Sequence, residues 1–98
     1  MVRTSIPDSA IVIANDDVLT TAFGNEIVVL NLHDGVYYGL DDAGARIWQL
    51  LRTPVSVEAL RDTVVAEFDV EPANCERDIR SLITELLEHG LVKVREGP

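Results

Sequence analysis

The sequence predicts an α+β fold in which an N-terminal three-stranded antiparallel sheet is followed by three helices. The first forty residues contain short runs rich in β-branched residues, separated by turn-forming Asp, Asn and Gly. From Asp41 onward, apolar residues recur instead at the three- and four-residue spacing of helices. Ninety-eight residues, 47% of them hydrophobic, suffice for one core. We therefore expect one domain over residues 1–98, with flexible ends at 1–8 and 95–98.

Short apolar runs bounded by turn residues define the strands. Ile11–Ala14 and Val18–Phe23 predict one or two short strands. Glu26–Leu32 is rich in β-branched residues, and the Asp34-Gly35 pair after it is typical of a hairpin turn. Val36–Leu40 is then the returning strand of a hairpin.

Side chains alternate along this returning strand, because successive residues of a strand point to opposite faces. Val36, Tyr38 and Leu40 face one side, and Tyr37 and Gly39 face the other. A glycine inside a strand weakens it unless something approaches its backbone closely. A strand at the edge of a sheet also leaves N–H and C=O groups free to pair with an added strand. We expect Tyr38 to be a core or margin residue and Tyr37 to be available for contacts.

The first helix begins where the returning strand ends. Asp41 or Asp42 is suited to cap its N-terminus, and Pro54 follows its end. Trp48 is expected to be a core or margin residue of this helix. Its apolar face consists of Ala43, Ile47, Leu50 and Leu51.

Two further helices and a short strand complete the chain. Ser56 caps the second helix, and Pro72 stands at the first turn of the third. The third helix is the longest and ends near His89, with Gly90 as its C′ residue. Leu91–Val94 is a terminal strand or wing, so the order of elements is that of a winged helix-turn-helix module carrying a hairpin. The apolar stripe of the second helix is Val57, Leu60, Val64 and Phe68, and that of the third is Ile79, Leu82, Ile83, Leu86 and Leu87.

Charge and cysteine content exclude several kinds of partner. Seventeen acidic against eight basic residues give a net charge of −9, which disfavours binding to a phosphate backbone. A single cysteine, Cys75, allows neither an intrachain disulfide nor a CxxC motif, which suits a reducing cytoplasm. The apolar run Ile11–Ala14 is too short for a secretory or membrane-spanning segment. We expect a cytoplasmic protein that binds neither nucleic acid nor membrane.

No combination of residues predicts catalysis, a metal site or a cofactor. His33, His89 and Cys75 have no second ligand at a suitable spacing, and nucleotide-binding glycine loops are absent. We expect His33 to cap the hairpin turn and His89 to complement the C-terminal end of the third helix. Cys75 is expected to be a buried, inert thiol. The chain is therefore predicted not to be an enzyme.

Residues 27–94 resemble the PqqD-like family of small peptide-chaperone domains, which are called RiPP recognition elements. The matching residues follow the chain in order. They are DGVYYGL (34–40), D-x-x-G-x-x-I-W-x-L-L (41–51), Val57 and Leu60 of the second helix, and D-I-x-x-L-I-x-x-L-x-x-x-G-L-V (78–92). Asp41 departs from the pattern, since the family frequently has Asn at this position.

The resemblance implies a winged helix-turn-helix that binds the leader segment of a ribosomally made precursor peptide and presents it to a partner enzyme. The leader adds as a strand beside the returning strand, in a groove walled by the third helix. The most similar members are the free-standing proteins of lasso-peptide clusters, which work with a transglutaminase-like leader peptidase and a macrolactam-forming cyclase. The peptide-binding residues implied for this chain are Val36, Tyr37, Tyr38, Gly39, Leu40, Asp78, Leu82 and Glu85.

The helix residues in this set depend on which margin of the third helix lines the groove. One margin carries Asp78, Leu82 and Glu85, and the other carries Arg80, Ile83 and Leu87. We favour the first, because Asp78 belongs to the family pattern and is awkward to explain as a core residue.

Two other functions fit the same elements. A winged-helix DNA-binding regulator would use Arg77 and Arg80, although the third helix also carries Glu76, Asp78, Glu85 and Glu88. A dimerisation or scaffold domain would pair the free strand edge with its own copy. We expect a monomer or a weak dimer.

Overall fold

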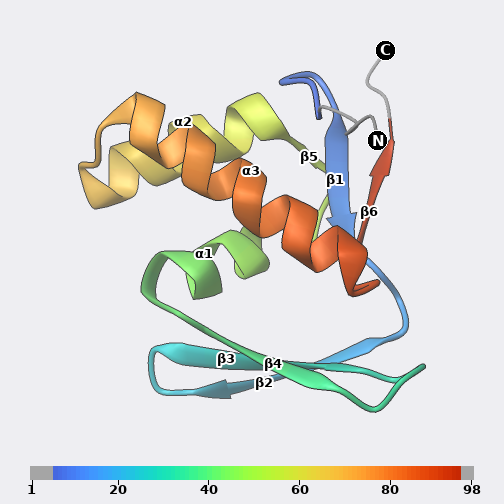
Figure 1. The fold of residues 1–98 in the computed structure, drawn as a ribbon. Helices are drawn as coiled ribbons and strands as arrows, with labels where there is room; N and C mark the ends of the chain where they lie inside the picture. Colours follow the sequence, from blue (N-terminus) through green and yellow to red (C-terminus); the bar gives the residue numbers. More distant parts are fainter. Residues whose placement is uncertain (1–5, 96–98) are drawn as a thin grey trace.

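The computed structural model describes residues 6–95 and confirms the predicted α+β fold and its order of elements (Figure 1). Most of the ends expected to be flexible, residues 1–5 and 96–98, lies outside the described part. The strands are β1 (Ile11–Ala14), β2 (Val18–Phe23), β3 (Glu26–Asn31), β4 (Tyr37–Asp41), β5 (Val55–Ser56) and β6 (Val92–Arg95). The helices are α1 (Asp42–Leu50), α2 (Val57–Phe68) and α3 (Pro72–Glu88).

The strands of residues 6–95 form two antiparallel sheets. The hairpin sheet has the order β2-β3-β4, so β3 is its central strand and β2 and β4 are its edges. The second sheet has the order β5-β1-β6 and joins the beginning, middle and end of the chain. Figure 1 shows the hairpin sheet below the helices and the second sheet beside them. The sequence pattern predicts the hairpin sheet but not the partners of β1.

The turn between β3 and β4 is closed by its own side chains. The Asp34 carboxylate accepts a hydrogen bond from the Val36 N–H at 2.9 Å, and Gly35 adopts a positive φ of 72°. Val36 therefore belongs to the turn, and β4 begins one residue later than predicted. His33 does not cap this turn; its ring lies 2.8 Å from the Asp17 carboxylate.

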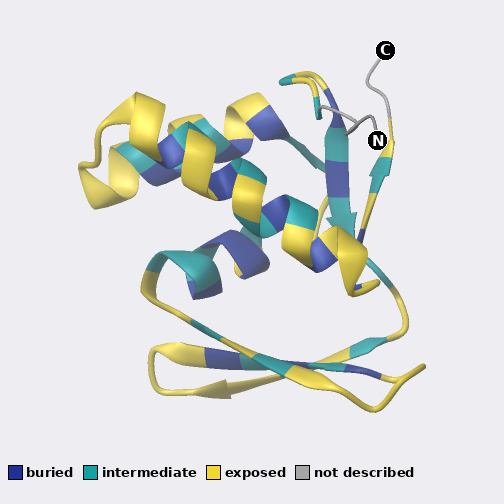
Figure 2. Cartoon of the chain, in the orientation of Figure 1, coloured by how far each residue is buried: buried dark blue, intermediate teal, exposed yellow. Residues whose placement is uncertain are grey.

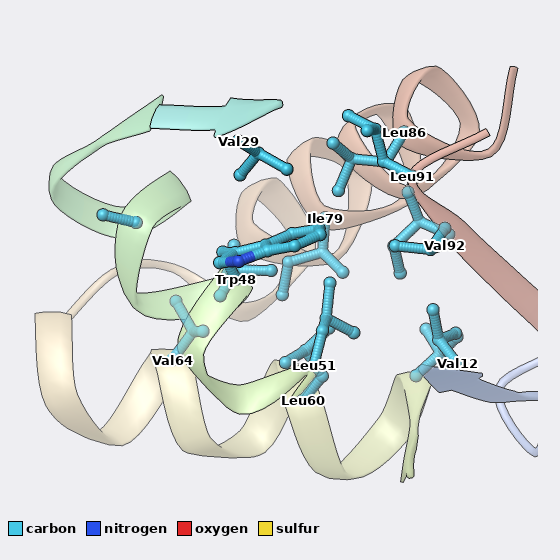
Figure 3. Close-up of a cluster of buried hydrophobic side chains, with 14 of the residues drawn as sticks. Val12, Val29, Trp48, Leu51, Leu60, Val64, Ile79, Leu86, Leu91 and Val92 are labelled. Carbon is cyan, nitrogen blue, oxygen red and sulfur yellow. The ribbon is translucent and has the colours of Figure 1, made fainter. Parts of the chain in front are cut away.

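One face of the hairpin sheet covers the helices and closes the core. Ile27 and Val29 of β3 point into it and are buried. Trp48 of α1 is fully buried, and its indole Nε1 donates a hydrogen bond to the Thr20 hydroxyl at 3.1 Å. In Figure 3, Trp48 lies at the centre of the cluster between Val29 and Leu51. This contact fixes α1 against the sheet and confirms Trp48 as a core residue.

The helix boundaries follow local signals. Asp42 has a positive φ of 47°, which turns the chain from β4 into α1 without a linker. Asp41 is the N-cap residue, but its side chain makes no capping hydrogen bond. The Ser56 hydroxyl accepts from the Ala59 N–H at 3.0 Å at the start of α2, and Pro72 occupies the first turn of α3.

Gly90 ends α3 as predicted. Its φ is 72°, its N–H donates to the Leu87 carbonyl, and the Leu91 N–H donates to the Leu86 carbonyl at 2.9 Å. This pair of bonds is a Schellman motif, which requires the left-handed conformation that glycine adopts without strain. The chain can therefore leave the helix at once and continue into β6.

Two residues predicted for apolar faces are exposed. Phe68 at the end of α2 is 37% exposed, and Leu87 of α3 is 41% exposed. Both lie at the ends of their helices, where fewer neighbours pack. Cys75, in contrast, is buried as expected. None of the helices described is long and apolar enough to cross a membrane.

Candidate functional site

The outer edge of β4 is open: no strand among residues 6–95 pairs with it. The register determines which backbone groups this edge presents. The Asn31 N–H donates to the Val36 carbonyl at 2.9 Å, and the Leu32 N–H donates to the Asp17 carbonyl at 3.0 Å. The backbone N–H and C=O groups of odd-numbered β3 residues therefore form hydrogen bonds with β4, and those of even-numbered residues form hydrogen bonds with β2.

The partner residues on β4 alternate in the same way. Tyr38 and Leu40 lie opposite Val29 and Ile27, so their backbone groups are used within the sheet. The N–H and C=O groups of the other β4 residues point to the open edge. These residues are Tyr37, Gly39 and Asp41. Asp41 is missing from the predicted site because its sequence context marks it as a helix cap.

The side chains of β4 are divided between the two faces of the sheet as predicted. Tyr38 and Leu40 face inward and are half-buried against the core. Tyr37 and Gly39 are exposed on the outer face. Gly39 has neither a positive φ nor any atom within 4 Å of the position that a Cβ would occupy. Nothing within the described chain thus requires glycine there.

Tyr38 connects β4 to α3. Its ring lies 4.6 Å from the His89 ring, centroid to centroid, with a tilt of 38°. Burial raises the pKa of the Tyr38 hydroxyl, and the negative charges of Asp34 and Glu85 raise it further. The hydroxyl is therefore a neutral hydrogen-bond donor and acceptor at the boundary between strand and helix.

The two margins of α3 have different surroundings. Glu85 lies near Tyr38, Leu82 is half-buried against the core, and Asp78 lines a pocket shared with α1. On the opposite margin, the Arg80 guanidinium is bonded to the Asp8 carboxylate. The margin that carries Asp78, Leu82 and Glu85 is thus the one on the side of α1 and β4.

A pocket of about 330 Å³ lies among α1, the C-terminal half of α2, the loop after it and the N-terminal half of α3. Ala43 and Ile47 of α1 form one wall, and Asp78 belongs to the opposite wall. Cys75 also borders it, and burial raises the pKa of this thiol, with a smaller contribution from Asp78. The pocket is mainly apolar, which suits a hydrophobic side chain of a bound segment. Its α1 residues were expected only as core.

Two asparagines hold the C-terminal end of α3 against the sheets. The buried Asn31 side chain donates to the His89 carbonyl at 2.8 Å and accepts from the His33 N–H at 2.8 Å. The Asn15 side chain donates to the Gly90 carbonyl at 2.7 Å. These bonds tie the C-terminal end of α3 to the end of β3 and to the loop between β1 and β2. No motif in the sequence marks either residue, because the bonds join segments far apart in the chain.

Comparison with known protein families finds a match that covers most of the chain. The profile described as "Coenzyme PQQ synthesis protein D (PqqD)" matches residues 26–92, which include β4, all three helices and the candidate site. The chain belongs to the PqqD family. This confirms the resemblance found in the hairpin and in the run of α3. A search of curated proteins finds no match to this PqqD-family chain.

Two solved structures are similar to it. "TbiB1 in Complex with the TbiA(beta) Leader Peptide" shares 34% identity with a TM-score of 0.78 and covers 83% of this chain and 94% of that chain. "Lasso peptide synthetase B1 complexed with the leader peptide" shares 28% identity with a TM-score of 0.74 and covers 84% of this chain and 96% of that chain. Both of these relatives of the PqqD-family chain hold a leader peptide.

Proposed function

We propose that this PqqD-family protein is a non-enzymatic adaptor that binds the leader of a ribosomally made precursor peptide and delivers it to a leader peptidase in lasso-peptide biosynthesis. One observation carries the proposal: β4 leaves its outer edge open in a fold whose solved relatives are complexed with leader peptides. A strand-shaped ligand fits such an edge because backbone hydrogen bonds supply affinity with little dependence on ligand sequence.

The leader pairs with the outward N–H and C=O groups of Tyr37, Gly39 and Asp41. Its side chains then alternate between two environments, because an added strand shares the pleat of the sheet. Those that point inward enter the space between β4 and the Leu82 margin of α3. Those that point outward lie beside Tyr37. Specificity comes from the inward positions, where burial is greatest.

Strand addition also explains how an adaptor without catalytic groups assists an enzyme. A free leader samples many backbone conformations, whereas a paired leader is held extended along β4. The segment that follows the leader then leaves the domain in one direction. Orienting a substrate in this way lowers the entropic cost of its encounter with a peptidase. We propose that the peptidase is transglutaminase-like and that a macrolactam-forming cyclase acts after it.

The structure gives no support to DNA recognition by α3. Arg80 is bonded to Asp8 and lies 3.6 Å from Glu76, and Arg77 is bonded to Asn74. These guanidinium groups are thus engaged within the protein. Phosphate binding depends on cations that are available to replace counterions. Self-pairing of β4 remains a competing use of the same edge.

The test measures binding of a fluorescently labelled leader peptide. This leader is encoded by the precursor gene that neighbours the gene of this protein. Fluorescence anisotropy should show saturable binding, and adding this protein should accelerate cleavage of the precursor by the neighbouring peptidase. Sedimentation with and without leader distinguishes self-pairing from leader binding, because a dimer paired through β4 must dissociate before the leader binds. No binding up to high concentration, together with an unchanged cleavage rate, would refute the adaptor function.

A further inference from the structure

The second sheet, β5-β1-β6, has an outer face that carries positive charge. Val12 of β1 and Val92 of β6 are buried in the core, so alternation turns the residues beside them to the opposite face. The register aligns these outward residues in two pairs across the strands, each with one isoleucine and one cation. The pairs are Ile13–Lys93 and Ile11–Arg95, and we call these four residues the basic face.

The cations of the basic face are available to a partner. Lys93 and Arg95 are exposed, and neither takes part in an ion pair within residues 6–95. Figure 2 shows β6 with exposed segments beside the more buried β1. Other guanidinium groups are bonded within the protein: Arg46, Arg61, Arg77 and Arg80. In a chain of net charge −9, the basic face is therefore a local surface of opposite sign.

The two isoleucines give the basic face an apolar centre. Ile11 and Ile13 are half-buried, and neither belongs to the side chains packed against the hydrophobic core. Ile13 also borders a cavity of about 490 Å³, whose lining includes Arg52 and Asp16. The Asp16 carboxylate offsets the charge of Arg52, so the positive charge of this surface comes from β6.

The outer edge of β6 is open within residues 6–95. The Asn15 N–H donates to the Leu91 carbonyl at 2.9 Å, so odd-numbered residues at this end of the chain bond toward β1. The N–H and C=O groups of Val94 therefore point to the open edge. A polypeptide strand matches both groups, whereas a phosphate group of a lipid or nucleic acid offers no donor for the carbonyl. The edge thus favours a protein partner over an anionic lipid surface.

We propose that the basic face binds an extended acidic segment of the macrolactam-forming cyclase. Asp or Glu side chains of this segment pair with Lys93 and Arg95, and its apolar side chains pack on Ile11 and Ile13. The proposal rests on the proposed function, because the cyclase is a partner in the same pathway. A second copy paired through β6 does not fit, since it would bring the Lys93 and Arg95 side chains of both copies together.

The place of the basic face in the fold suits this partner. The face belongs to a different sheet from β4, so a segment bound there leaves the leader edge unoccupied. In the proposed order of steps, the peptidase removes the leader before the cyclase acts. The leader then no longer links the cyclase to the complex, whereas a contact with the adaptor itself keeps it nearby.

The deciding experiment uses the double variant Lys93→Glu/Arg95→Glu. The probe is the cyclase encoded beside the precursor gene, and its binding to the full-length protein is measured by calorimetry without leader at low and at moderate salt. The double variant should bind the cyclase at least about tenfold more weakly, because attraction becomes repulsion at two positions. Binding of the unmodified protein should weaken as salt is added, and the variant should lose most of this dependence.

Two single variants separate position from total charge. Lys93→Glu and Arg77→Glu change the net charge equally, and Arg77 is an exposed residue of α3. Only Lys93→Glu should weaken cyclase binding. Ile13→Thr keeps a β-branched side chain and should weaken binding a few-fold without altering its salt dependence. Leader affinity and urea midpoint, measured in parallel, should be unchanged in Lys93→Glu.

Three results would overturn the proposal. The first is that the unmodified protein does not bind the cyclase, and the second is that Arg77→Glu weakens binding as much as Lys93→Glu. The third is that the double variant instead loses self-association in sedimentation or loses binding to phosphatidylserine vesicles, because a second copy or a membrane would then be the occupant. Failure of the adaptor function is a separate result, since it is read from leader binding by the unmodified protein.

Discussion

Replacing Gly39 by proline separates pairing with the leader from folding. The Gly39 N–H points to the open edge of β4, so proline removes a donor that no strand of the described chain uses. Proline is tolerated at an edge strand where its nitrogen faces solvent. Tyr38, which precedes it, is already extended, as a residue before proline prefers to be.

The size of the effect follows from one hydrogen bond at the centre of the pairing. Losing the bond and leaving the opposed leader carbonyl unpaired costs about 1–3 kcal/mol. This corresponds to leader binding that is roughly five- to more than a hundredfold weaker, since about 1.4 kcal/mol equals tenfold. The proline ring adds steric hindrance where the leader backbone lies, so we expect the upper part of this range.

The assay compares the leader dissociation constant from anisotropy with the urea midpoint for three variants. Ala22→Pro is the matched control, because the Ala22 N–H points to the open edge of β2 by the same alternation. It should cost similar stability and leave leader affinity unchanged. Gly39→Ala retains the donor, and its Cβ has open space in the free protein. Equal loss of leader affinity in Gly39→Pro and Ala22→Pro would refute pairing at β4.

Three further predictions concern the core, the helix pair and the pocket. Thr20→Val leaves the buried Trp48 indole N–H unpaired and should lower the free energy of unfolding by about 1–3 kcal/mol, measured in urea. Glu67→Gln should lower the urea midpoint at neutral pH, because Arg46 hydrogen-bonds the Glu67 carboxylate at 2.8 and 2.9 Å and lowers its pKa. Cys75, whose pKa is raised by burial, should react slowly with a thiol reagent, and saturating leader should slow it further.

Each of these predictions has its own control. Thr21→Val changes the same residue type on the outer face and should shift stability by less than about 0.5 kcal/mol. The stabilisation of the fold by the Glu67 carboxylate depends on pH. Because the pKa of Glu67 is lower in the folded state than in the unfolded state, this stabilisation is complete above the unfolded-state pKa and is lost as the pH falls through the folded-state pKa. The urea midpoints of the unmodified protein and of the Glu67→Gln variant should therefore converge below about pH 4. Unchanged Cys75 reactivity with leader present would show that the pocket stays empty.

Local signals made much of this fold predictable. The Asp34-Gly35 turn, the Ser56 cap, Pro72 and the Schellman glycine at Gly90 each act within a few residues, so their patterns are visible in the chain. The alternation that places Tyr37 outward and Tyr38 inward is equally local.

Long-range pairing was not predictable in the same way. The partners of β1 come from the middle and the end of the chain, and a four-residue strand does not specify them. Asn31 is a buried polar residue whose partner carbonyl, that of His89, comes from the far end of α3. The backbone groups that face the open edge depend on register, which is set by the buried face and the turn geometry together. The turn includes Val36, which the sequence pattern assigned to the strand.

Amide hydrogen exchange with and without leader tests the central claim most directly, because strand addition must protect alternate amides of β4. In the free protein, the amides of Tyr38 and Leu40 should be protected by pairing with β3, and those of Tyr37, Gly39 and Asp41 should exchange fast. Saturating leader should protect these three amides and leave the open edge of β2 unchanged. Protection confined to β2, or no new protection in β4, would contradict leader binding by strand addition at this edge.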